Sequence, residues 1–131
     1  MRVVVGAAVL DGRGRVLAAR REHPAGWEFP GGKVEDGEGE PVAVARELAE
    51  ELGVAVAVGA RVGPDVPVAG GDLVLRVWTA RITAGVPVAT EHAALRWVGA
   101  ADLGSLDWLP ADRPVLSAVA ALLTGDEPPR G

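Results

Sequence analysis

Cysteine is absent from this chain of 131 residues. Its absence excludes disulfide bonds, thiolate-bound zinc and a cysteine nucleophile, and it suits a reducing cytoplasm. Any metal that this protein binds is therefore expected to have oxygen ligands.

A hydrophobic run long enough to cross a membrane is also lacking. The apolar stretch over residues 1–10 is shorter than the roughly 20 residues that a spanning helix needs, and a turn follows it directly. The stretch has no signal-peptide layout either. We therefore expect a cytoplasmic protein that does not bind membranes.

Positive charge is scarce. Lysine and arginine number 13, with Lys33 the only lysine, against 18 acidic residues, and the net charge is -5. A nucleic-acid duplex is therefore a poor candidate ligand, because its phosphate backbone needs a basic surface. A free nucleotide that carries its own metal remains compatible. The length suits one domain, and monomer and homodimer both stay open.

The middle of the chain is predicted to form a helix of about three turns between Pro41 and Gly53. Proline suits the first turn, where a backbone N–H has no helical partner, and glycine is a typical left-handed stop. Val44, Leu48 and Leu52 recur every four residues and should form the stripe that faces the core.

Three glutamates, Glu47, Glu50 and Glu51, share another face of this helix. One interpretation is a solvated acidic surface. However, like charges four residues apart destabilise a helix, its C-terminal end prefers cations, and only Arg46 is placed to offset the charge. Carboxylates are the ligands that Mg2+ and Mn2+ prefer, so we expect a divalent-metal site here.

Strands are predicted to outnumber helices. Two strands flank Asp11-Gly12-Arg13-Gly14, which predicts a hairpin. Three more strands and a second helix follow the first helix, and the last seven residues are expected to be a disordered tail. The predicted strands span 2–10, 15–21, 54–62, 73–82 and 95–98, the loops 63–71 and 83–90, the second helix 114–123 and the tail 125–131.

The residues around the first helix also match a known pattern, G-x5-E-x7-R-E-U-x-E-E-x-G-U, where U is a bulky aliphatic residue. By this match the chain resembles the Nudix hydrolases, and segments 26–35 and 107–114 look like those of MutT-type members. The nine matching positions are Gly32, Glu38, Arg46, Glu47, Leu48, Glu50, Glu51, Gly53 and Val54.

The resemblance implies an α/β (α+β) Nudix fold, in which a mixed β-sheet is sandwiched between helices (α/β/α) in one domain over residues 1–124. It also implies a metal-dependent hydrolase that cleaves diphosphate bonds in nucleotides.

The resemblance further implies the roles of the helix residues. Glu47, Glu50 and Glu51 would bind Mg2+ or Mn2+ together with the main-chain oxygen of Gly31. Arg46 would orient these glutamates by ion pairing and hydrogen bonding.

Glu91 is a further candidate, because it lies six residues before Trp97. MutT-like enzymes carry a glutamate at this separation, and it contributes to metal binding or acts as the general base. A surface position is the alternative for Glu91. Glu50 and Glu51 are the alternative bases.

Four residues are expected to bind the substrate. By resemblance, Arg21 contacts a phosphate or the base, Lys33 belongs to the same site, and the residue at the position of Asp112 faces the base. Alternatively, Arg21 lies at an exposed strand end and Asp112 caps a helix. Trp108 either stacks on the base or fills the core.

Aspartate at position 112 favours cytosine. An ionised carboxylate accepts a hydrogen bond from the exocyclic amine of cytosine. The edge of 8-oxoguanine presents a donor beside an acceptor, so the aspartate would have to be protonated, which burial can achieve. dCTP, CTP and 5-methyl-dCTP therefore lead as substrates, with 8-oxo-dGTP next.

The expected activity is hydrolysis of a nucleoside triphosphate to a monophosphate and pyrophosphate, which would sanitise or balance the nucleotide pool. One alternative is a hydrolase of another nucleoside-diphosphate-X substrate. Another is a non-catalytic nucleotide-binding sensor. Such sensors commonly lose the carboxylates of the Nudix pattern. All of these carboxylates are present here.

Overall fold

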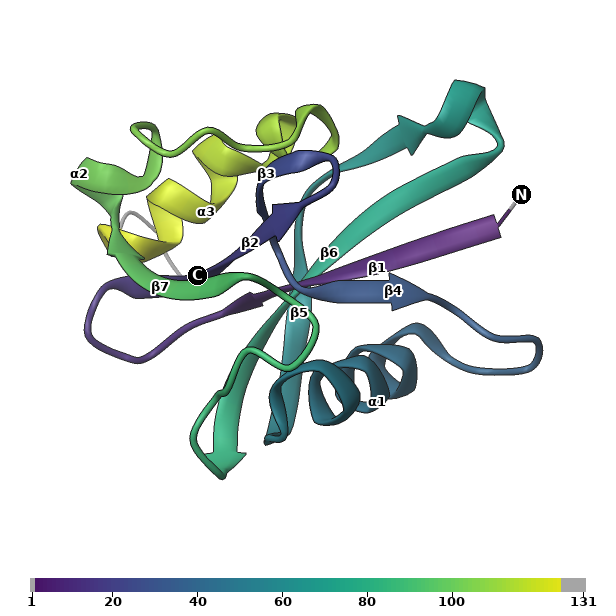
Figure 1. Ribbon diagram of the computed structural model, residues 1–131, viewed down its shortest axis with the longest axis horizontal. Helices are drawn as coiled ribbons and strands as arrows, with labels where there is room; N and C mark the ends of the chain where they lie inside the picture. Colours follow the sequence, from purple (N-terminus) through teal and green to yellow (C-terminus); the bar gives the residue numbers. More distant parts are fainter. Residues whose placement is uncertain (1, 126–131) are drawn as a thin grey trace, which may run out of the picture.

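The computed structural model describes residues 2–125 (Figure 1). All but the first residue of the predicted tail lies outside these residues. The strands are β1 Arg2–Val9, β2 Arg15–Glu22, β3 Ala25–Glu28, β4 Gly31–Lys33, β5 Ala55–Val68, β6 Leu73–Ala84 and β7 Ala94–Gly99. The helices are α1 Glu40–Leu52, α2 Ala100–Leu103 and α3 Leu116–Leu123, with 3-10 helices η1 Ala69–Gly71 and η2 Pro110–Val115.

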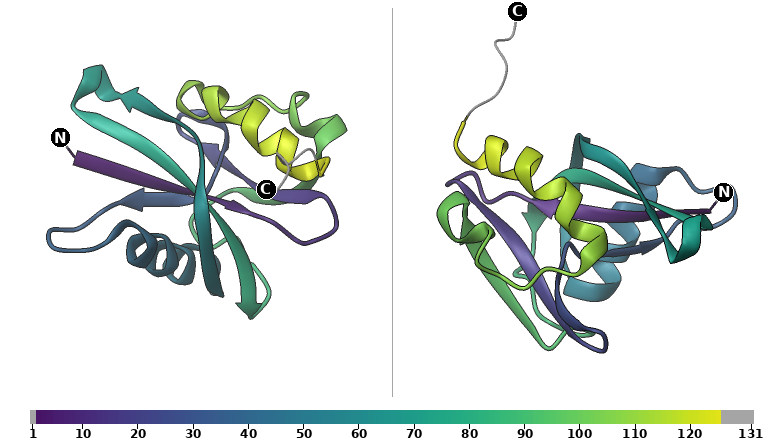
Figure 2. Two further views of the ribbon diagram at one scale, coloured as in Figure 1. Left: turned by 180° about the vertical axis from the view of Figure 1, so that it is seen from behind. Right: turned by 90° about the horizontal axis from the view of Figure 1, so that it is seen from above.

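Two sheets form the framework. The larger sheet has the strand order β4-β1-β6-β5, in which β1 runs parallel to β6 and the other neighbours are antiparallel. The smaller sheet, β3-β2-β7, is antiparallel. Helix α1 lies on one side of β1 and α3 on the other (Figures 1 and 2). The predicted mixed sheet between helices, in a single domain, is thereby confirmed.

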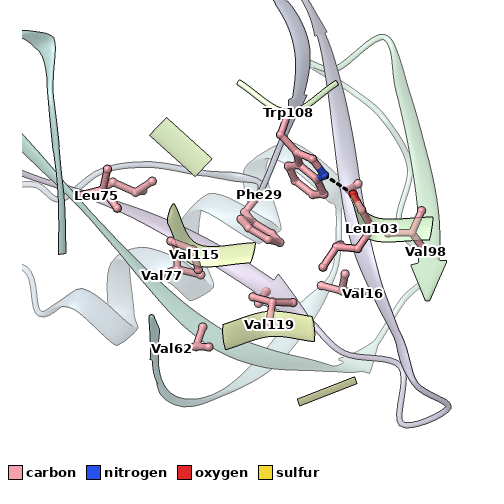
Figure 3. Packing of buried hydrophobic residues seen from close by; sticks show 13 residues of the cluster. Val16, Phe29, Val62, Leu75, Val77, Val98, Leu103, Trp108, Val115 and Val119 are labelled. Carbon is pink, nitrogen blue, oxygen red and sulfur yellow. Dashed lines mark hydrogen bonds between the residues drawn. The ribbon is translucent and has the colours of Figure 1, made fainter. Parts of the chain in front are cut away.

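Strand β1 divides the core into two clusters. Its side chains alternate, so Val5, Ala7 and Val9 pack in the cluster that includes α1, whereas Ala8 packs in the cluster that includes α3. All four side chains have no exposed surface. Figure 3 shows the cluster beside α3, where Val119 closes the core.

The predicted hairpin between β1 and β2 is only partly correct, because the turn forms but the two strands do not pair with each other. The turn itself forms, because the Asp11 carboxylate accepts hydrogen bonds from the backbone N–H groups of Arg13 and Arg15, at 2.7 and 3.0 Å. The two strands then enter different sheets. Both edges of β1 are already paired, with β4 and β6, so β1 and β2 form no ladder, and a single isolated bridge between Leu10 and Val16 follows the end of β1.

Two predicted boundaries also differ. Strand β5 continues to Val68 through part of the predicted Pro/Gly-rich loop, because a shift in its pairing between Val62 and Val66 absorbs the intervening residues. The second helix begins earlier, as the 3-10 helix η2, and becomes α-helical only after Pro114 and Val115. The sequence pattern missed the short elements β3, β4, η1 and α2.

Candidate active site

Helix α1 presents its glutamates to a pocket because its opposite side is held in the core. The predicted stripe of Val44, Leu48 and Leu52 is at most 1% exposed. The helix ends at Gly53, which has the predicted left-handed conformation with φ 71°.

A pocket of about 880 Å3 is lined by both sheets, α1, η2 and the connection between β6 and β7. Most of the predicted site residues meet in it. Those lining it are Arg21, Gly31, Lys33, Glu47, Glu51, Glu91 and Asp112, whereas Arg46, Glu50 and Trp108 are not among the lining residues.

Two glycines allow the backbone of β4 to pass close to its neighbours. A Cβ atom on Gly32 would lie 2.5 Å from the Glu47 carboxylate, and one on Gly31 would overlap the carbonyl oxygen of Val5. A side chain at Gly31 is therefore excluded by the backbone of β1, and one at Gly32 would displace the Glu47 carboxylate. The glycines bring the Glu47 carboxylate against the main chain at the edge of the pocket.

Arg46 holds the carboxylates at the outer side of this region. Its guanidinium donates to both oxygens of Glu38, at 2.7 and 2.9 Å, and to the carbonyl oxygen of Lys33 at 3.1 Å. It also donates to Glu47 at 2.9 Å and to Glu50 at 3.5 Å. The hydrogen bonds from Arg46 hold the pKa of Glu38 down at about 2. Arg46 thus ties the chain before α1 to the acidic face of the helix.

Glu51 has the opposite environment. Only 7% of the residue is exposed, and its Oε2 is buried without a hydrogen-bond partner among the described residues. Burial, with a smaller contribution from the charges of Glu47, Glu91 and Glu28, raises the pKa of Glu51 to about 8 against the opposing effect of His92. A buried carboxylate surrounded by like charges favours a bound cation.

The residues present fit a divalent metal. Within residues 2–125 no three acidic or histidine side chains already converge as a complete metal-binding group. Arg46 instead binds the carboxylates of Glu47 and Glu50, while Glu51 is buried. The unpartnered oxygen of Glu51 and the surrounding carboxylates are the hard oxygen ligands that Mg2+ and Mn2+ select.

Glu91 reaches the pocket on a connection that packs on the C-terminal end of α1. The backbone N–H of Val88 donates to the carbonyl oxygen of Leu52 at 3.1 Å, and the Thr90 hydroxyl donates to that of Glu51 at 2.5 Å. These contacts place Glu91 beside the acidic face, with its side chain exposed to solvent at the pocket.

Of the two alternatives for Trp108, the structure places it in the core and not among the residues that line the pocket. Its residue is 2% exposed, and its indole N–H donates to the carbonyl oxygen of Leu103 at 2.7 Å (Figure 3). Its ring lies 4.8 Å from that of Phe29, with 34° between the planes. Phe29 itself lines the pocket, so Trp108 supports an aromatic wall from behind.

Asp112 is a second buried carboxylate that lines the pocket. It lies inside η2 with 5% exposure, and neither η2 nor α3 has a side-chain cap, so the alternative of a helix cap is wrong. Its Oδ1 accepts a hydrogen bond from the backbone N–H of Phe29 at 3.1 Å. Burial raises the pKa of Asp112 to about 7, although the Phe29 hydrogen bond opposes the shift.

Two cationic side chains also line the pocket. Arg21 lies at the end of β2 and donates to Glu28 at 3.4 Å, and Lys33 ends β4. Arg20, which alternates with Arg21 along the strand, is not among the lining residues.

The sequence patterns missed Glu28 and His92. The two side chains meet at 2.8 Å although 64 positions separate them. Neither residue belongs to a sequence motif that would identify it as a site residue, and the sequence predicts no role for His92. Only the adjacency of His92 to Glu91 could have drawn attention to it.

Within the part of the chain that the structure describes, no helix is both long and apolar enough to cross a membrane.

Comparison with known proteins agrees with the geometry. A family model described as the NUDIX domain matches residues 1–119. Proteins of two Mycobacterium tuberculosis strains with the provisional name 8-oxo-dGTP diphosphatase 2 are 48% identical over 130 residues, covering 94% of this chain and 91% of theirs. The CTP pyrophosphohydrolase of Escherichia coli is 38% identical over 125 residues, covering 92% of this chain and 93% of its own.

A solved structure shares the fold. The crystal structure of a MutT NUDIX hydrolase from Burkholderia pseudomallei superposes with a TM-score of 0.78 at 33% identity, covering 90% of this chain and 97% of that one.

Proposed function

Since this chain belongs to the Nudix family, whose members hydrolyse diphosphate bonds and generally need a divalent metal, we propose that it hydrolyses a nucleoside triphosphate to a monophosphate and pyrophosphate. One observation carries the proposal. A single pocket is lined by two buried carboxylates from different elements, Glu51 of α1 and Asp112 of η2. This arrangement suits a molecule with a charged phosphate chain and a base that forms hydrogen bonds.

The metal is Mg2+, with Mn2+ as a substitute, and it supplies positive charge that stabilises the charge developing on the phosphate oxygens. The residues that would hold it are Glu47, Glu50, Glu51, Glu91 and the main-chain oxygen of Gly31. Arg46 keeps Glu47 and Glu50 oriented through its hydrogen bonds.

The remaining groups bind and orient the substrate. The cationic side chains of Arg21 and Lys33 line the pocket, where they can bind the phosphate oxygens. Glu51 and Glu91 line the pocket, whereas the Glu50 side chain is 59% exposed beside Arg46. The pocket geometry therefore favours Glu51 or Glu91 as the group that takes a proton from the attacking water.

Asp112 recognises the base by hydrogen bonding to its edge. One of its oxygens accepts from the backbone N–H of Phe29, which leaves the other for a base edge beside the Phe29 ring. With a pKa of about 7, this carboxyl is a donor below neutral pH and only an acceptor above it. The ionised form matches the amine of cytosine, and the protonated form matches 8-oxoguanine. The names of the two relatives agree with these two substrate classes.

The test compares kcat/KM for dCTP, CTP, 5-methyl-dCTP and 8-oxo-dGTP at pH 6 and pH 8.5, with Mg2+. We expect the ratio of cytosine to 8-oxoguanine substrates to rise with pH in the wild type. Asp112→Asn should lower the rate with cytosine substrates about tenfold, since one base contact is worth about 1–3 kcal/mol, and should remove the pH dependence of the ratio. An identical ratio in both proteins at both pH values would contradict base reading by Asp112.

A further inference from the structure

His92 has a buried imidazole on a connection between strands. Its side chain is 4% exposed, although loop side chains usually face solvent. The Nε2 atom lies 2.8 Å from the Oε2 atom of Glu28 at the end of β3. A neutral ring that donates from Nε2 to this carboxylate leaves its Nδ1 atom as an acceptor.

His92 and the buried Glu51 of α1 line the same pocket. His92 Nδ1 and Glu51 Oε2 are both buried, and neither has a hydrogen-bond partner among residues 2–125. The imidazole thus pairs with a carboxylate of the smaller sheet and lines the same pocket as the Glu51 carboxylate of helix α1.

Backbone contacts on either side of His92 join the same two parts of the fold. The Thr90 hydroxyl donates to the carbonyl oxygen of Glu51 at 2.5 Å, and the Ala93 N–H donates to that of Arg20, in β2, at 2.8 Å. The connection thus bridges α1 and the smaller sheet, and Glu91 lies within the bridged segment.

We infer that His92 is a positioning residue, which fixes Glu91 against Glu51 by anchoring the connection to Glu28. The inference rests on the proposed metal-binding roles of Glu51 and Glu91. In this role His92 touches neither substrate nor metal. It acts by holding the carboxylates of two separate chain segments in one arrangement, as groups that orient metal ligands do in other proteins.

Three variants test this role. His92→Phe keeps a ring but removes both nitrogens, whereas His92→Gln keeps an amide nitrogen that can donate to Glu28. Val86→Ser, at a 78% exposed position of the same connection, is the matched control. The readouts are the affinity of the nucleotide-free protein for Mn2+, measured by electron paramagnetic resonance, and the kcat and KM for the preferred triphosphate.

We expect His92→Phe to weaken Mn2+ binding and lower kcat, each by about 10- to 100-fold, with a much smaller change in KM. His92→Gln should recover part of both losses, and Val86→Ser should match the wild type. Equal Mn2+ affinity and equal kcat in His92→Phe and the wild type would overturn the inference.

Nitrogen NMR of the histidine rings gives a second, independent answer. The chain has two histidines, so His23→Gln identifies the signal of His92. We expect a ring protonated at Nε2, whereas the tautomer average of a free histidine would overturn the inference even if His92→Phe failed to fold. If the wild type hydrolysed no triphosphate, the proposed function would fail, while Mn2+ affinity and ring NMR would still decide the role of His92.

Discussion

Two regions of the pocket are held together in different ways. We call the region around the acidic face of α1 the metal end and the region around Asp112 the base end, after the roles proposed for them. At the metal end, Arg46 connects Lys33, Glu38, Glu47 and Glu50, all within 13 positions of itself. At the base end, Asp112 meets the backbone of Phe29 across 83 positions. Local contacts depend on spacing in one segment, whereas the base end exists only after the whole chain has folded.

Their electrostatics differ as well. Near Arg46, hydrogen bonds hold the pKa of Glu38 down at about 2. Burial instead raises the pKa of Glu51 to about 8 and that of Asp112 to about 7. Acidic residues in and beside the pocket therefore differ in proton affinity according to whether a bound cation or burial dominates their environment.

The largest effect should come from pH and metal together. The pKa of Glu51 is higher in the folded protein than its ordinary 4.5, so the folded state binds this proton more tightly than the unfolded state. The metal-free protein should therefore be most stable below about pH 4.5 with respect to this group, and should lose several kcal/mol as pH rises to about 8.

Thermal and urea unfolding between pH 5 and pH 9 measure this loss. Glu51→Gln should flatten the profile, whereas Glu50→Gln, at the exposed neighbour, should keep it. Mg2+ or Mn2+ should stabilise the wild type more at pH 8.5 than at pH 6, because a ligand carboxylate must lose its proton to bind the metal. A wild-type profile unchanged by Glu51→Gln would contradict a pKa raised by burial.

A smaller effect is expected from adding one carbon at the metal end. Gly32→Ala would push the Glu47 carboxylate away from β4, so metal affinity and kcat should fall by about 10- to 100-fold. Gly39→Ala is the matched control, because Gly39 has φ -74° and a Cβ atom added there would meet nothing within 4 Å. Mn2+ titration and steady-state kinetics compare the two, and equal losses would show that packing at Gly32 has no special role.

The smallest effect on catalysis is expected behind the base end. Trp108→Phe removes the hydrogen bond to Leu103 and should lower the free energy of unfolding by about 1–3 kcal/mol. Its KM for nucleotide should stay close to that of the wild type, because the side chain is in the core. Phe29→Leu, which alters the pocket wall, should raise KM. Urea unfolding measures the stability of both variants, and steady-state kinetics measures their KM. A KM that rises in Trp108→Phe but not in Phe29→Leu would contradict the core role of Trp108 and favour its contact with the base.

Sequence patterns predicted the metal end better than the base end. The helix, its apolar stripe and its terminal glycine follow from spacing within one segment, and the structure has all three. The separation of β1 and β2 into two sheets could not be predicted from their turn, since it depends on β4 and β6 occupying both edges of β1.

The same limit applies to individual site residues. Trp108 and Phe29 are both aromatic, and their sequence does not distinguish which one lines the pocket. The tertiary packing of the segments that carry them decides it. The contact between Glu28 and His92 likewise requires two distant segments to meet. Spacing identifies residues that act within one element, whereas burial and partner choice arise from the tertiary fold.

The most direct test of the proposed activity is phosphorus NMR of the products formed from dCTP and 8-oxo-dGTP with Mg2+, for the wild type and Glu51→Gln. We predict nucleoside monophosphate and pyrophosphate in equal amounts from the wild type, and a rate at least about 100-fold lower in the variant. Release of inorganic phosphate without pyrophosphate, or an unchanged rate in Glu51→Gln, would contradict a metal-dependent pyrophosphohydrolase built around this carboxylate.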